Sequence, residues 1–354
     1  MNNLYIIGNG FDLYHGLDTK YQSFAKFLAE EDEEIYDLLL TYYGLPDISQ
    51  SFIKFLAEED EENYDLLLNY YGSPNLLEDP VNDVENLEWA NFESSLANLD
   101  YKQVLEDNSD AAANLSSDDF RDRDLHTYQF EMEMIIDKLT VRLISIFNLF
   151  ILNINYPERI DNKKIELNSD SIFLNFNYTN TLEKYYNISN SNICYIHKKS
   201  IDKNSQIVLG HGTDPSKFEE TQRETPKGLS KEELIEWMEH MSEQYDFSYE
   251  SAKREILSYY TKSFKNVRLI IDDNVDFFLK LNNIKNVYVL GHSISSVDMD
   301  YFKTVFANIH QNAVWYVSYY SDFEKENHLK TLLSLGIKNE NIKQIRIEDL
   351  KHIS

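Results

Sequence analysis

The sequence has a single cysteine, Cys194, among its 354 residues. One cysteine excludes an internal disulfide and any zinc site built from cysteines. Its context, Asn-Ile-Cys-Tyr-Ile, predicts a buried strand position rather than a nucleophile. Such cysteine usage is typical of a reducing compartment, and we therefore expect a cytoplasmic protein.

Positive charge is also scarce. The sequence has 33 Lys and Arg residues but 61 Asp and Glu residues, which gives a formal net charge of −28. A surface of this sign repels a phosphate backbone. A broad nucleic-acid groove is excluded unless the charge is strongly segregated, so we expect no nucleic-acid partner.

Long apolar runs are missing as well. The most apolar segment, residues 139–154, is interrupted by Arg142, Asn148 and Asn153 and is shorter than the ~20 residues that a bilayer span needs. It is expected to be a buried helix, with a helix that docks on a membrane as the alternative. No basic start, apolar stretch and small-residue cleavage site open the sequence, so neither a signal peptide nor a membrane partner is expected.

What the sequence does contain is a tandem duplication. Residues 22–49 recur as residues 50–77, with 21 of 28 positions identical, which indicates a copying event. Two copies are too few for a solenoid, which needs at least three repeats. Each copy has apolar residues at helical spacing and a Tyr-Tyr-Gly ending before proline, so each is expected to form one or two helices with a solvated acidic face.

Short apolar runs rich in Ile, Val and Tyr predict the strands of a parallel sheet that is covered on both faces. These runs are residues 4–7, 171–177, 193–197, 206–210, 286–291, 313–319 and 343–347. Helices are expected over residues 84–99, 127–155, 231–240, 248–260, 275–281, 300–309 and 323–335.

This order of elements predicts an α/β fold with a Rossmann-like parallel sheet and a large helical insertion. Residues 1–20 and 165–354 would form the nucleotide-binding core. Residues 21–164, including the duplication, would form the insertion.

The turn Gly8-Asn-Gly-Phe-Asp12 follows the first strand, at the place where open α/β sheets bind ligands. Glycines there let backbone N–H groups approach a phosphate. Leu13 takes the third glycine position of the usual dinucleotide fingerprint, so a purely structural turn is the alternative. Because an ionised Asp12 would repel phosphate, its expected partner is a ribose hydroxyl, a backbone cap or a water.

Polar residues also follow other predicted strands, as Phe176-Asn-Tyr-Thr179, His197, Gly210-His211, and Gly291-His-Ser293 leading to Asp298. The carboxyl ends of parallel strands share one edge of the sheet, so these residues are expected to converge on the Gly8 turn. Three alternatives stay open. Asn177 could only cap a helix, the histidines could brace loops, or His211, His292 and Asp298 could form a metal site, although their spacing matches no known short motif.

Together these residues resemble the AbiH family of bacterial abortive-infection proteins, which disable the phage-infected cell. The resemblance covers the chain nearly end to end, and the second copy of the duplication looks like an addition. It rests on Ile7-Gly-Asn-Gly-Phe-Asp12, His15-Gly16, Thr19, Tyr21, Phe24, Trp89 with Glu93, Phe176-Asn-Tyr-Thr179, His197, Gly210-His211, and Gly291-His-Ser293 with Asp298.

AbiH proteins are in turn similar to the sirtuin fold, whose members bind NAD. Here Gly8-Asn-Gly10 stands for the sirtuin glycine turn, Asn177 for the motif asparagine, His197 for the histidine, and Gly291-His-Ser293 for the late loop. Asn9, Asp12 and Lys198 depart from the sirtuin pattern, and the zinc cysteines are missing, so the resemblance does not predict protein deacetylation.

The resemblance implies a defence effector that binds NAD, or a related small nucleotide, and hydrolyses it without a metal. Asn177 would orient the water or the ribose, and His197 would accept a proton. The implied nucleotide-binding residues are Gly8, Asn9, Gly10, Phe11, Asp12, Gly16, Thr19, Tyr178, Gly210, His211, Gly291, His292, Ser293 and Asp298.

A phage-derived trigger and self-association into a homo-oligomer are further partner hypotheses. A non-catalytic nucleotide sensor or interaction protein is the first alternative function. A metal-dependent nuclease is the second.

Overall fold

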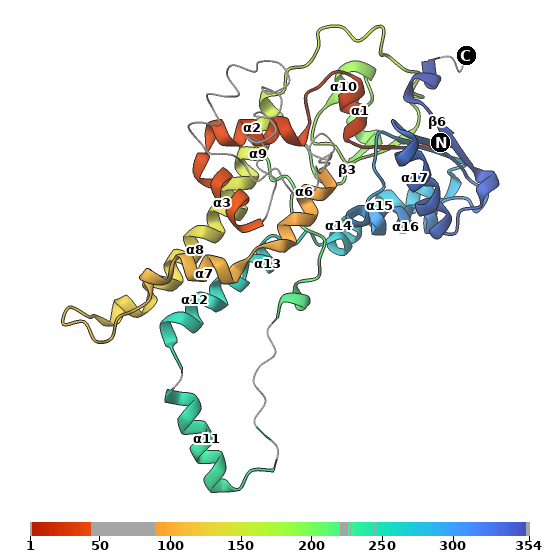
Figure 1. The fold of residues 1–354 in the computed structure, drawn as a ribbon. Coiled ribbons are helices and arrows are strands. Elements are labelled where there is room, and N and C mark those ends of the chain that lie inside the picture. Colours follow the sequence, from red (N-terminus) through yellow and green to blue (C-terminus); the bar gives the residue numbers. More distant parts are fainter. Residues whose placement is uncertain (1, 44–88, 220–225, 227, 244, 352–354) are drawn as a thin grey trace, which may run out of the picture.

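The computed structural model describes residues 2–43, 89–219, 226, 228–243 and 245–351 (Figure 1). Its centre is a six-stranded, all-parallel sheet in the order β3-β2-β1-β4-β5-β6. This is the strand order of doubly wound dinucleotide-binding sheets, with the switch point between β1 and β4. The strands are β1 (Asn3–Ile7), β2 (Ile172–Asn175), β3 (Ile193–Tyr195), β4 (Asn286–Leu290), β5 (Val314–Ser318) and β6 (Ile342–Ile345).

Helices cover both faces of the sheet, which explains why the strands lack polar alternation. One face packs against α15 (Val275–Leu279), α16 (Met299–Asn308) and α17 (Asp322–Ser334). The other packs against α1 (Asn9–Tyr14) and α10 (Thr181–Tyr186). The α/β class and the parallel sheet predicted from the sequence are confirmed.

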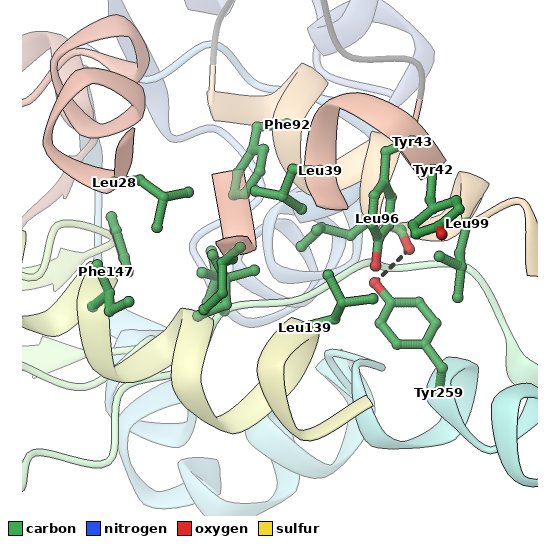
Figure 2. Close-up of a cluster of buried hydrophobic side chains, with 14 of the residues drawn as sticks. Leu28, Leu39, Tyr42, Tyr43, Phe92, Leu96, Leu99, Leu139, Phe147 and Tyr259 are labelled. Atoms are coloured by element: carbon green, nitrogen blue, oxygen red, sulfur yellow. Dashed lines mark hydrogen bonds between the residues drawn. The ribbon is translucent and has the colours of Figure 1, made fainter. Parts of the chain in front are cut away.

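A second hydrophobic core lies in a separate helical region, which Figure 1 shows beside the sheet. Its side chains interdigitate in Figure 2, where Tyr259 also donates a hydrogen bond to the carbonyl of Leu96 at 2.9 Å. The region comprises α2 (Tyr21–Glu31), α3 (Glu33–Tyr43), α6 (Trp89–Ser95), α7 (Tyr101–Asp107), α8 (Thr127–Asp137), α9 (Leu143–Asn153), α12 (Phe247–Leu257) and α13 (Tyr259–Lys262).

Most expected elements are present. The first copy of the duplication forms two helices, α2 and α3, while the second copy lies outside the described residues, as do residues 84–88. A π-helical turn, Lys138–Arg142, joins α8 to α9, so the helix predicted over residues 127–155 is one continuous element. None of the described helices combines the length and the apolar character needed to cross a membrane.

Two features differ from the prediction. Residues 206–210 form no strand, because Gly210 lies against the carbonyl of Ser263 and the His211 amide donates to that carbonyl at 3.1 Å. The segment therefore pairs with a loop instead of the sheet. In addition, α12 and α13 bury side chains in the helical region although their residues were expected in the sheet core.

The remaining helices are α11 (Lys231–Glu243), which stands apart in Figure 1, and α14 (Val267–Asp273). The sequence indicated α11 over residues 231–240. It gave no signal for α14.

The duplication offers a test of the helical core. Ile35 is fully buried there, whereas Asn63 takes the corresponding place in the second copy. We expect Ile35→Asn to lower the free energy of unfolding by roughly 3 kcal/mol, because it removes apolar contact and buries an amide without a partner.

Chemical denaturation measures this effect. Thr41→Asn is the matched control, since residues 41 and 69 also differ between the copies and Thr41 is exposed. A loss for Ile35→Asn no larger than for the control would contradict this packing.

Candidate functional site

The Gly8 turn is packed directly against the loop that follows β4. The Gly8 amide donates to the carbonyl of Leu290 at 3.0 Å, and the Gly10 amide donates to that of Gly291 at 2.7 Å. A Cβ on Gly8 would lie 2.6 Å from the Gly291 carbonyl oxygen, and a Cβ on Gly291 would lie 2.1 Å from the Phe11 nitrogen. These glycines are thus required by backbone contact across the β1–β4 switch point, and both amides are already paired.

Asp12 braces the same turn against the residues after β2. Its carboxylate is 1% exposed and accepts 2.6 Å hydrogen bonds from the hydroxyls of Thr179 and Thr181. Burial raises the pKa of Asp12 to about 6, although both hydroxyl bonds favour the ionised form. The sequence led us to expect a ribose hydroxyl, a backbone cap or a water as the partner of Asp12; the structure instead shows these two threonine hydroxyls, which the sequence reasoning did not foresee.

Asn177 is the link between β2 and the Gly8 turn. It is 7% exposed, and its side-chain amide donates to the carbonyl of Gly8 at 3.0 Å. Its own backbone amide donates to the side chain of Asn175 at 3.0 Å. Asn177 therefore lies against the Gly8 turn, as the sequence predicted, and it begins no helix, since α10 starts at Thr181.

His197 follows β3 and points toward Asp298. It is 4% exposed, and its Nε2 lies 3.9 Å from Asp298 Oδ1. That nitrogen has no hydrogen-bond partner among the described residues, while the ring also bonds the backbone of Phe176. If Nδ1 donates to Phe176, then Nε2 and Oδ1 are two acceptors facing each other, a pair that a hydroxyl or a water would satisfy.

Asp298 belongs to a group of five buried ionisable residues that we call the buried ionic cluster. Lys265 Nζ lies 2.9 Å from Glu93 Oε2 and 3.3 Å from Asp298 Oδ1. His292 Nε2 lies 3.6 Å from Asp298 Oδ2. The members are Glu93 from α6, His197 from the loop after β3, Lys265 from the loop between α13 and α14, and His292 and Asp298 from the connection between β4 and α16.

The charge states in the cluster follow from burial and from Lys265. Burial, and then the charge of Lys265, lower the pKa of His197 to about 3. Burial lowers the pKa of His292 to about 4, so both rings are neutral near pH 7. Burial acts to raise the pKa of Asp298, but Lys265 together with His292 and His197 outweighs it, and the pKa falls below its ordinary value. Burial raises the pKa of Glu93, although Lys265 opposes this shift. Two carboxyl groups thus face one ammonium group.

The His211 ring is fully buried among Phe218, Tyr260 and Phe264. Among the described residues, no three His, Cys, Asp or Glu side chains form a group that could hold a metal ion. The metal alternative therefore gains no support from this part of the chain.

The other predicted site residues occupy varied positions. Tyr178 stacks 6.0 Å from the His197 ring and donates to the Val208 carbonyl at 2.7 Å. The Asn9 side chain donates to the carbonyl of Thr19 at 3.0 Å. Phe11 is in the core, Gly16 follows α1 with φ +85°, and Ser293 is half-buried after β4.

Lys265 was missed by the sequence reasoning, and Glu93 was noted only through the family resemblance. Glu93 is the only charged residue of helix α6, Trp89–Ser95. A single carboxylate in an otherwise uncharged helix was the sequence signal that could have pointed to a functional Glu93. Lys265 sits in a segment that reads as mildly basic surface, yet its side chain is fully buried. The burial of Lys265 becomes apparent only from the structure, in which residues 263–265 pair with His211.

The fold and the site define an α/β protein with a doubly covered parallel sheet and a buried polar site at the carboxyl ends of its strands. The family described as bacteriophage abortive infection AbiH matches residues 4–319, and the chain belongs to this family. No curated protein and no solved structure matches the chain. Family membership supports a role in abortive-infection defence against bacteriophage.

The buried Asp12 predicts a pH dependence of stability. Its pKa is raised from 3.8 to about 6 on folding, so the folded state binds the proton more tightly. The stabilisation from this group is present below pH 4 and is lost as the pH rises toward 6, by on the order of 2–3 kcal/mol.

Asp12→Asn removes that titration. We expect the free energy of unfolding of the wild type, relative to the variant, to fall by this amount between pH 4 and pH 7 in urea denaturation. A difference that stays constant over this range would contradict the raised pKa.

Proposed function

We propose that the protein is an abortive-infection effector that binds NAD, or a closely related nucleotide, and hydrolyses its bond between nicotinamide and ribose. The observation that carries this proposal is the unpartnered Nε2 of His197, buried 3.9 Å from the Asp298 carboxylate. A neutral imidazole next to an ionised carboxylate is the arrangement of a general base. Proton transfer from a water to this nitrogen is the chemistry that it supports.

The reaction balances with water as the only co-reactant. The bond between the ribose carbon and the nicotinamide nitrogen breaks, and its electron pair stays on nicotinamide. Water adds to the ribose carbon and gives its proton to His197 Nε2, where Asp298 stabilises the imidazolium that forms. The products are nicotinamide, ADP-ribose and a proton.

The other predicted binding residues differ in how well they suit the pyrophosphate and the ribose of a nucleotide. The amides of Gly8 and Gly10 are already paired, so they are poorly suited to grip a pyrophosphate. Asn177 lies one hydrogen bond from this turn and is better suited to orient a ribose. The site is also almost closed, since Asn177, His197 and Asp298 are each less than a tenth exposed, and ligand entry requires these loops to separate.

The proposal predicts that His197→Gln lowers the rate of NAD loss about 100-fold, because the proton acceptor is removed. Asn177→Ala should have a similar effect, since the ribose or the water would lose its orientation. Nicotinamide release by the purified full-length protein, measured by chromatography, tests both.

Asn180→Ala is the matched control, because Asn180 lies three residues from Asn177 and is exposed. Its rate should equal that of the wild type. A wild-type protein that never consumes NAD, even with lysate of phage-infected cells, counts decisively against the proposal.

A second candidate is a non-catalytic nucleotide sensor. It is favoured by the Asn177 amide, which is already bonded to the Gly8 carbonyl and so acts as a structural link. This candidate predicts tight binding of NAD or ADP-ribose in calorimetry without turnover, and affinity that Asn177→Ala leaves unchanged. Turnover of NAD by the wild type would rule it out.

A further inference from the structure

We propose that Lys265 is a positioning residue for His197, and that the helical region controls it through Glu93. This inference rests on the proposed function, because it assigns a role in that reaction to residues outside the reacting pair. The ammonium group of Lys265 fixes the Asp298 carboxylate beside the His197 ring.

The geometry of Asp298 carries the argument. Its Oδ1 lies 3.3 Å from Lys265 Nζ and 3.9 Å from His197 Nε2, so one oxygen faces both groups. Its Oδ2 lies 3.6 Å from His292 Nε2. Lys265 therefore determines which oxygen of the carboxylate faces which imidazole.

Hydrogen bonds hold both the side chain and the backbone of Lys265 in place. Its side chain is fully buried, and its Nζ donates to Glu93 Oε2 at 2.9 Å, on helix α6 of the helical region. Its backbone amide donates to the carbonyl of His211 at 2.8 Å. A buried ammonium group with two carboxylates and a fixed backbone has little freedom to move, so a shift of α6 would be transmitted to Asp298.

Three aromatic rings of the described residues lie beside the His197 ring. Their centroid distances are 5.3 Å for Phe176, 5.9 Å for Tyr301 and 6.0 Å for Tyr178. The charged or titratable groups that act on it most strongly are Lys265, Asp298 and His292. Lys265 opposes a proton on His197, and Asp298 favours one. Burial is the main reason why the His197 ring is neutral, and the ammonium group of Lys265 adds to this effect.

A histidine titration tests the inference without depending on NAD cleavage. Long-range nitrogen–proton NMR spectra of the full-length protein report the pKa of each imidazole, and His197→Gln assigns the His197 signal. We expect Lys265→Met to raise the pKa of His197 by about one unit or more, because the opposing charge is gone while Asp298 stays.

Two further variants keep the test sharp. In Glu93→Gln with Lys265→Met, both partners are neutral, which avoids a buried unpaired Glu93, and the same upward shift is expected. Lys262→Met is the matched control, since Lys262 pairs with Glu255 at 3.0 Å on the surface. It should leave the His197 signal unchanged.

Kinetics give the second readout. In both variants that remove Lys265, the acid limb of the pH profile of kcat for NAD cleavage should move to higher pH in step with the NMR shift. Folded variants with an unchanged His197 titration would overturn the inference. If the Lys265 variants shift the His197 titration as expected but the wild type never cleaves NAD, the proposed function is refuted and the role of Lys265 stands.

Discussion

The ion pair network around Lys265 is the interaction on which the arrangement of the site depends. A single fully buried ammonium group contacts Glu93 from the helical region and Asp298 from the sheet. Removing one member of such a pair leaves an uncompensated buried charge, at a cost of roughly 3–5 kcal/mol. The hydrophobic core of the helical region and the core clusters on the two faces of the sheet are therefore also joined by a charged contact, which lies at the candidate site.

The glycine turn illustrates how a motif can be located correctly while its physical role differs from the usual one. In dinucleotide-binding sheets the glycines free backbone amides for a pyrophosphate. Here Gly8 and Gly10 instead allow the β1 and β4 loops to touch, at a distance that no side chain would permit. Asp12 and Asn177 then tie this turn to the residues after β2. The glycine turn thus has a structural role at the edge of the site, and the ionisable groups lie next to it.

Much of the fold was predictable because parallel strands that are buried on both faces have a plain apolar sequence signature. Six strands were predicted to follow β1, and five of them are present. The strand over residues 206–210 failed because the same signature arises wherever backbone is buried, here against residues 263–265. In the site, Asn177 and His197 were found because they directly follow strands. Lys265 was not predicted, because its position depends on a backbone contact with His211, and the sequence around neither residue indicates that contact.

The burial of the site bears on how a defence effector avoids harming its own cell. If His197 is the base of the proposed reaction, burial keeps its ring neutral near pH 7, so control would act on access or on geometry instead of protonation. Under that proposal, the loops that meet at Gly8 and Gly291 limit access, and Glu93 links α6 of the helical region to the buried ionic cluster. A displacement of the helical region relative to the sheet would then alter the Glu93–Lys265 contact, and with it the position of Asp298 beside His197.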